Sequence, residues 1–160
     1  MKEENAVASL VEDYLNLKKH EFKSIVDKIT PKNPKFISKI EKNKYLNYED
    51  IHIILIYNYT DYEIREDKYY HTLNDTLIDI THFTREKDNL LEFLKKELKR
   101  TLKEYKINDE MIDLVLNINN DNFFVLEKGL NFIYSYNQFG IKNTEQFSIL
   151  VNYVVLNDIN

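Results

Sequence analysis

The sequence predicts an α+β fold in which helices pack on one face of an antiparallel sheet. One observation is that the spacing of apolar residues changes along the chain. In residues 5–29 and after Thr84, apolar residues recur every three or four positions, as on one face of a helix. In 51–60 the side chains fall on two alternating faces, as in a strand. The other is the aromatic segment 122–136, whose halves flank Lys128-Gly129 as two strands flank a tight turn. Helix, strands, helix and strands therefore follow one another.

Composition predicts a single folded domain over residues 1–160. The chain has 160 residues, of which 43% are hydrophobic and 31% charged, with only 2 Gly and 2 Pro. No repeat, linker or composition break divides it. A chain of this length can bury about two-thirds of its unfolded surface in one core. We divide it into an N-terminal helix, 1–30, and a second region, 36–160, in which the resemblance described below lies.

The first half is expected to contain one long helix followed by strands. Residues 5–29 carry an amphipathic pattern that ends before Pro31 and Pro34. A weakly alternating segment, 36–45, precedes 51–60, which is β-branched and aromatic on both faces and is predicted to be a central strand. The charged segment 61–68 is expected to be a loop. Strands 69–73 and 76–81 then flank a turn at Asn74-Asp75.

In the second half, a long helix is predicted after Thr84. Its inward stripe should consist of Leu91, Leu94, Leu98, Leu102 and Tyr105. A shorter helix should begin after Asn108, a good N-cap, and bury Met111, Ile112, Leu114 and Val115. The hairpin closed at Lys128-Gly129 follows, and a last strand is expected over 146–151, with Phe147 and Ile149 on one face.

Charge and length restrict the classes of function. The net charge is −5 and the pI about 5.4, which disfavours nucleic acid and favours a cationic partner. Residues 51–59 are interrupted by His52 and Asn58, so no transmembrane segment is expected. Cysteine is absent, and the first residues do not resemble a signal peptide. Either the protein is cytoplasmic or its native N-terminus has been removed.

Neither a metal site nor a catalytic site is expected. His71, Asp75, Asp79 and His82 are close in sequence, but a two-residue turn at 74–75 would make His71 face Ile78 rather than a carboxylate. The carboxylate pairs Glu63/Glu66 and Asp109/Glu110 lie in polar stretches where solvation keeps pKa values ordinary. No glycine-rich phosphate loop is present. We therefore predict no metal, no cofactor and no catalytic residue.

The strongest candidates for binding are tyrosines around the charged segment 61–68. Tyrosine suits an interface because it buries a large area and keeps a polar tip. Acidic residues of the segment would attract a cationic protein. The predicted binding residues are Tyr59, Tyr62, Glu63, Tyr69 and Tyr70.

Beyond the central strand, the order of elements resembles a family of bacterial extracytoplasmic domains. The similar segments are Tyr59-Thr60, 69–80, Thr81-His82-Phe83, Phe123-Phe124-Val125-Leu126, Gly129-Leu130, 132–136 and 145–149. They resemble the C-terminal domain of the lysozyme-sensing anti-sigma factor RsiV and of the peptidoglycan deacetylase PdaC. The Gly-Gly-Ala-His loop of that family is replaced here by 61–65.

The resemblance implies a non-enzymatic, extracytoplasmic domain of the kind found in bacterial lipoproteins. Such a domain would recognise a protein, with a cationic lysozyme-like protein as the first candidate, or a cell-wall partner. The alternative, which rests on the acidic composition, is a cytoplasmic inhibitor or immunity protein that masks a basic enzyme surface. A longer native reading frame with a signal peptide would favour the first hypothesis.

Overall fold

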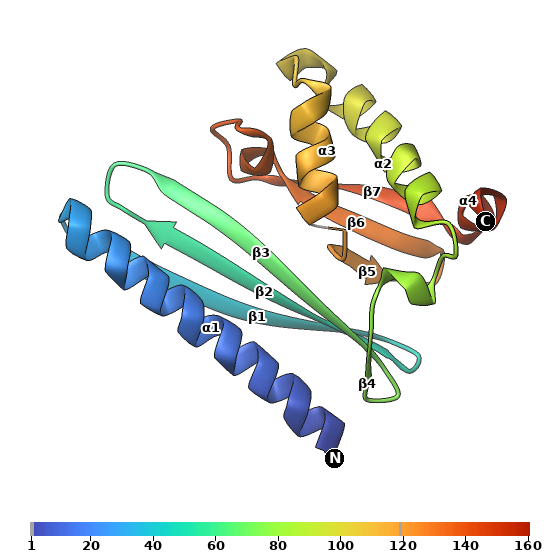
Figure 1. Ribbon diagram of the computed structural model, residues 1–160, viewed down its shortest axis with the longest axis horizontal. Coiled ribbons are helices and arrows are strands. Elements are labelled where there is room, and N and C mark those ends of the chain that lie inside the picture. Colours follow the sequence, from blue (N-terminus) through green and yellow to red (C-terminus); the bar gives the residue numbers. More distant parts are fainter. Residues whose placement is uncertain (1, 119) are drawn as a thin grey trace. The chain divides into compact units, whose positions relative to one another are not determined.

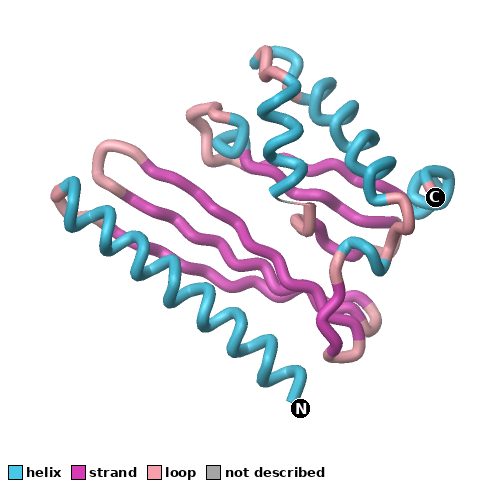
Figure 2. The backbone as a smooth tube through the Cα atoms, viewed as in Figure 1, coloured by secondary structure: helices cyan, strands magenta, loops and turns pink. Residues whose placement is uncertain are grey.

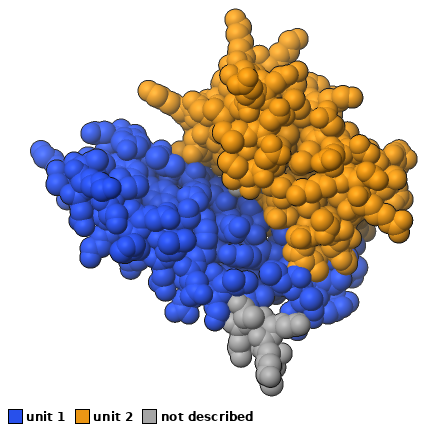
Figure 3. All heavy atoms as spheres, viewed as in Figure 1, with its two compact units in different colours: residues 1–77 blue, residues 78–160 orange. Residues whose placement is uncertain are grey.

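The computed structural model describes residues 2–118 and 120–160 and confirms the α+β class with antiparallel strands. Two compact units, residues 1–77 and 78–160, are coloured separately in Figure 3. Each unit has its own sheet, where the sequence predicted one sheet. The boundary falls inside a short strand and has no Gly- or Pro-rich linker, so composition gave no sign of it. That residues 1–160 fold as a single domain stays a prediction.

The first unit is one helix and a four-stranded sheet (Figure 1). Its strands are ordered β1-β2-β3-β4, so that β1 forms one edge of the sheet. The helix ends before the two prolines, as predicted. The elements are α1 (Lys2–Ile29), β1 (Lys35–Tyr45), β2 (Tyr48–Asn58), β3 (Glu63–Leu73) and β4 (Thr76–Ile78).

The core of this unit lies between α1 and one face of β2. Phe22 of α1 packs on the aromatic end of that face, with ring centroids 5.9 Å from Tyr57 and 5.3 Å from Tyr59. Strand β2 lies between β1 and β3, which confirms the predicted central strand. The buried members of the cluster are Val7, Val11, Phe22, Ile51, Ile53, Leu55, Tyr57 and Tyr59.

The predicted loop 61–68 is largely a strand, which corrects the sequence prediction. The reversal is confined to Tyr59–Tyr62, where the Tyr59 N–H donates to the Tyr62 carbonyl at 3.0 Å. From Glu63 onward the chain pairs with β2, and Leu55 stands opposite Glu66. Charged side chains have low strand propensity, but pairing with a buried central strand outweighs that preference. The strand predicted over 76–81 is shorter than expected, because β4 ends at Ile78.

The second unit combines helices with a three-stranded sheet of order β5-β6-β7 (Figure 2). The last helix was not predicted; it begins at Asn152, whose side chain accepts a hydrogen bond from the Val155 N–H at 2.9 Å. The elements are η1 (Ile80–His82), α2 (Lys87–Thr101), η2 (Lys103–Tyr105), α3 (Asp109–Ile118), β5 (Phe123–Val125), β6 (Gly129–Ser135), η3 (Tyr136–Phe139), β7 (Gln146–Asn152) and α4 (Tyr153–Ile159).

The predicted helices are present, with two corrections to their buried faces. In α2, Leu90 is buried in place of Leu91, while Leu94, Leu98 and Leu102 are buried as expected and Tyr105 is exposed. In α3, Asn108 caps the helix as predicted, but Leu114 is exposed and Leu116 is buried. Ile112 and Val115 are buried as expected and Met111 is half-buried. In both helices apolar residues lie one or two positions apart, so the sequence alone does not decide which of them faces inward.

The predicted hairpin is confirmed, but its turn lies one residue earlier. Strands β5 and β6 pair with Val125 opposite Leu130, and the Leu126 N–H donates to the Gly129 carbonyl at 2.9 Å. The turn residues are therefore Glu127-Lys128, and Gly129 begins β6. A Cβ on Gly129 would lie 2.2 Å from the Val151 carbonyl oxygen of β7. This glycine is required by a close approach of two backbones and not by a positive φ.

Substitution of Leu98 tests which face of α2 is buried. Leu98→Ala should lower the free energy of unfolding by about 2–5 kcal/mol, because it leaves a cavity in a fully buried site. Leu114→Ala, at a side chain that is 54% exposed, should change it by less than about 0.5 kcal/mol. Urea unfolding measures both. Equal losses would contradict the assigned helix faces.

Gly129 and Gly140 are needed for different reasons: the first leaves no room for a Cβ, and the second has a positive φ. Gly129→Ala should destabilise by about 3 kcal/mol or more, since the new Cβ would have to displace the backbone of β7. Gly140→Ala should lose only about 1–2 kcal/mol, because φ is +80° there but no atom lies within 4 Å of the new Cβ. Thermal unfolding of the two variants checks the order. A larger loss for Gly140→Ala would show that Gly129 is not sterically restricted.

Candidate functional site

The Glu66 carboxylate joins α1 to the sheet. It lies on the helix-facing side of β3 and accepts hydrogen bonds from the hydroxyls of Tyr14, at 3.1 Å, and Tyr57, at 2.9 Å. The Lys18 ammonium is 2.9 Å from the same carboxylate. Two of these three partners come from α1 and one from β2. Glu66, which the sequence analysis assigned to a loop, therefore holds α1 over β2 and β3.

The tyrosine and lysine partners of Glu66 are held in their protonated forms. Burial and the adjacent carboxylate both raise the pKa of the Tyr14 and Tyr57 hydroxyls. Burial opposes the charge of Lys18, but its hydrogen bond to Glu66 and the charge of that carboxylate raise the pKa of the ammonium above its usual range. All three groups therefore remain hydrogen-bond donors near neutral pH.

The predicted binding residues do not converge on one surface. Tyr59 is buried against Phe22, whereas Tyr62, which is 54% exposed, and Glu63 are open at the β2–β3 turn. Tyr70 lies seven residues along β3 from Glu63, which is about 23 Å in an extended strand. Tyr69 and Tyr70 point to opposite faces of the sheet because strand side chains alternate.

The other face of β2 and β3 carries two histidine–aspartate pairs. His52 Nε2 lies 2.6 Å from an Asp67 oxygen, and His71 Nδ1 lies 2.7 Å from an Asp50 oxygen. Tyr69 stacks on His52 with ring centroids 4.3 Å apart. The sequence analysis expected His71 not to face a carboxylate. The correction arises because its carboxylate comes from β2, while the prediction considered only the turn into β4.

The candidate metal residues are not assembled into a site. His71 is paired with Asp50, and the Asp79 carboxylate accepts hydrogen bonds from Thr81. Throughout residues 2–118 and 120–160, no group of three or more His, Asp or Glu side chains is placed to hold a metal ion. In the same described residues, no helix is long and apolar enough to cross a membrane.

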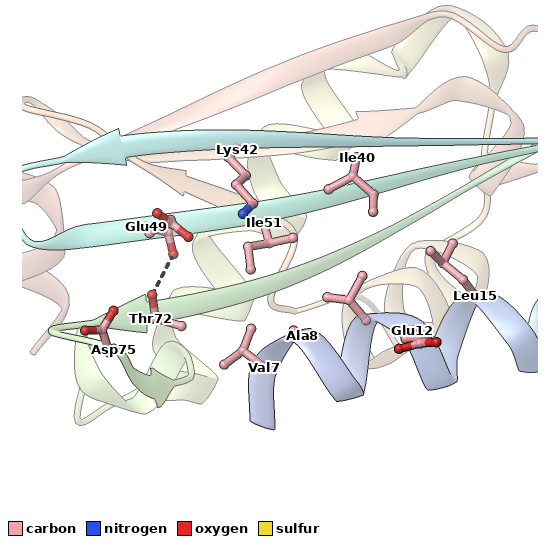
Figure 4. Close-up of a pocket in the computed structure, with 11 residues that line it drawn as sticks. Val7, Ala8, Glu12, Leu15, Ile40, Lys42, Glu49, Ile51, Thr72 and Asp75 are labelled. Atoms are coloured by element: carbon pink, nitrogen blue, oxygen red, sulfur yellow. Dashed lines mark hydrogen bonds between the residues drawn. The ribbon is translucent and has the colours of Figure 1, made fainter. Parts of the chain in front are cut away.

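A cavity of about 370 Å³ lies between the N-terminal turns of α1 and the sheet. Figure 4 shows Ile40 and Ile51 pointing from the strands toward α1, with Glu49, Thr72 and Asp75 grouped at one end. The walls on α1 are apolar except for one carboxylate. The helix residues that line the cavity are Val7, Ala8, Val11, Glu12 and Leu15.

A second cavity, of about 800 Å³ and more open, continues toward the C-terminal half of α1. Leu15 lines both cavities, and their β1 residues alternate along one face of that strand. The two cavities are therefore neighbours along α1; we call the surface that they form together the α1–β1 groove. The second cavity is lined by Leu15, Asn16, Lys19, His20, Phe22, Lys23, Val26, Phe36 and Ser38.

The β1 floor of the α1–β1 groove alternates apolar and polar residues, and its two ends differ in charge. Phe36 and Ile40 alternate with Ser38 and Lys42 along β1, and this segment is about 20 Å long. At the 36–38 end the charged lining residues are basic. At the Lys42 end three carboxylates outnumber that lysine; they belong to Glu12, Glu49 and Asp75.

Sequence analysis missed this groove, and none of the five predicted binding residues lines it. Two signals were available. The segment 36–45 alternates only weakly and has three lysines, which is typical of an edge strand. On α1, a row of polar residues at helical spacing runs beside the apolar stripe; it consists of Glu12, Lys19 and Lys23. Neither signal indicates a groove until the register of β1 on β2 is known.

Comparison with known proteins gives no relative from which a function could be transferred. No family model matches this chain, and no curated protein or solved structure is significantly similar to it.

Asp67 should contribute stability that is lost in acid. Burial opposes its charge, but hydrogen bonds from His52 and Arg65, and the charge of Arg65, lower the pKa of this carboxyl. Because the folded pKa lies below the unfolded value of about 3.9, the contribution is present above that pH and is lost as pH falls through the folded pKa.

Asp67→Asn should therefore lower the free energy of unfolding by about 1–3 kcal/mol at pH 7 and by less at pH 2.5. Asp61→Asn, in the exposed turn, is the matched control. Urea unfolding at the two pH values measures the difference. A loss that does not shrink in acid would contradict a charge-dependent role for Asp67.

Proposed function

We propose that this chain is a non-enzymatic binding domain that takes an extended segment of a protein partner into the α1–β1 groove. The observation that carries this proposal is that two cavities with Leu15 in common follow one another along α1, with Phe36 and Ile40 of β1 on their floor. The groove is open along one side and about 20 Å long, so it suits a length of polypeptide better than a compact small molecule.

The exposure of the groove residues also supports a partner. Ile40 is 45% exposed on the groove floor, and Ser38 beside it is exposed. An apolar side chain laid on this floor would remove both from water, which is the main source of favourable free energy in such contacts. The charged residues at the two ends would orient the segment rather than supply most of its affinity.

The groove supports this proposal better than the tyrosine surface supports a cationic partner. Of the acidic residues in 61–68, Glu66 is bonded to Tyr14 and Tyr57, and Asp67 is bonded to His52. These carboxylates are not available to attract a cationic protein. The resemblance to the RsiV C-terminal domain, and the extracytoplasmic location that it implies, remain part of the proposal. A lysozyme-like protein is still a reasonable first folded partner.

Ile40 and Ile37 provide a matched test. They lie on opposite faces of β1 and are 45% and 47% exposed, but only Ile40 lines the groove. Peptides selected against the purified chain from a random displayed library should bind Ile40→Asp at least about tenfold more weakly and Ile37→Asp within about twofold of the original chain. Calorimetric titration gives both values.

The circular dichroism and melting temperature of the two variants should agree, which would show that a loss of binding is not a loss of folding. The proposal is overturned if no peptide is enriched, or if the selected peptides bind Ile40→Asp as tightly as the original chain.

A further inference from the structure

We infer that the occupant of the α1–β1 groove adds to the sheet as a fifth main strand, antiparallel to β1, and carries its acidic residues in its C-terminal half. This inference rests on the proposed function and deepens it. Its starting point is the position of β1. The strand is the last in the order β1-β2-β3-β4, and no described strand pairs with its outer edge.

The outer edge of β1 offers backbone hydrogen bonds. In an antiparallel pair, alternate residues direct their N–H and C=O groups to the neighbouring strand, and the residues between them direct theirs outward. The β1–β2 pairing runs from Lys35 opposite Asn58 to Tyr45 opposite Tyr48, so outward groups recur along the whole strand. An extended segment beside β1 would satisfy them, which is the main-chain source of affinity in strand addition.

The side chains beside that edge select an amphipathic segment. On the groove face, the added strand would lie next to Phe36, Ser38 and Ile40, with Leu15 and Val26 of α1 above them. Apolar, β-branched side chains at alternate positions fill such a face. Residues between them would point to the other side of the sheet.

An antiparallel direction continues the pattern of this sheet, in which β1 and β2 and also β2 and β3 pair antiparallel. Charge then decides which half of the segment is acidic. At the Phe36 end, Lys19 and Lys23 line the groove, and Lys35 precedes Phe36 on β1. Carboxylates of the occupant are favoured beside these lysines and disfavoured at the other end, beside Glu12 and Glu49. Because an antiparallel occupant runs opposite to β1, the half that lies beside Lys35 is its C-terminal half.

A second copy of this chain fits the edge poorly. Pairing β1 with another β1 would bring two lysine-rich strands side by side, and like charges on neighbouring strands are destabilising. Edge lysines of this kind commonly prevent self-association. The same lysines favour an acidic strand. The lysines of β1 are Lys35, Lys39, Lys42 and Lys44, against the single carboxylate of Glu41.

The test uses a capped peptide of sequence Thr-Val-Thr-Val-Thr-Glu-Thr-Glu, whose valines and glutamates all lie on one face of an extended strand, and its reversed sequence, which has the same composition with its acids at the N-terminal end. The first peptide should bind the full chain at least about tenfold more tightly, and its affinity should fall as salt is raised. Lys19→Glu/Lys23→Glu should remove or invert this preference. Lys96→Glu/Lys142→Glu, with the same change in net charge at exposed positions of the second unit, should leave it unchanged.

N-methylation of the peptide separates strand addition from side-chain binding alone. Methylating the nitrogens of peptide residues 2, 4 and 6 and methylating those of residues 3, 5 and 7 should differ by at least about tenfold in affinity, because only one set faces β1. Equal effects of the two sets, or equal binding of the two peptide sequences, would overturn the inference. If library peptides nevertheless bind in an Ile40-dependent way, the proposed function survives; if none does, the proposed function fails as well.

Discussion

The first unit depends on the burial of one face of β2 beneath α1. Ile53 and Leu55 of that face are fully buried, and Phe22 of α1 covers its aromatic end. Neither element can exclude water from this surface alone, because a helix and a sheet each bury an apolar side only against a partner. Burial fixes the two layers against each other, and the Glu66 contacts fix the position of the helix across the strands.

The position of α1 explains why a groove exists beside it. Tyr14 and Lys18 of α1 bind Glu66 of β3, and Phe22 of α1 packs on Phe36 of β1 with ring centroids 5.6 Å apart, so the helix is anchored to both β3 and β1. The face of β1 that carries Ile40 is only partly covered. A hydrogen-bonded carboxylate on one side of the helix and a partly covered floor on the other are thus two results of one arrangement. This is why the proposed binding surface is formed from elements of the core.

In the second unit, backbone proximity restricts the sequence as strongly as side-chain packing. Gly129 lies where β6 and β7 approach so closely that a Cβ has no room. Asn108 and Asn152 each cap a helix with a side-chain oxygen, which satisfies donors that the helix leaves free. Such positions tolerate little change, although none of them belongs to the candidate site.

The sequence by itself determined the class of fold and most of its elements. Apolar periodicity identified α1, β2, α2 and β7, and the aromatic, β-branched flanks of 122–136 identified the hairpin although its turn was assigned one residue too late, because these signals arise from local backbone preference and from the need for one buried face. It did not determine that the chain forms two sheets, nor that Glu63 to Lys68 pair with β2. Pairing partners distant in sequence contribute free energy that no local pattern reveals.

Tertiary structure alone decided the candidate site. The five residues chosen from the sequence share a stretch of chain, but alternation along β3 sends Tyr69 and Tyr70 to opposite faces, and burial removes Tyr59 from the surface. The α1–β1 groove joins residues from opposite ends of α1 with one face of β1. Its charge and shape depend on the register of β1 on β2 and on where Glu66 holds the helix, and both are set by contacts between segments far apart in the sequence.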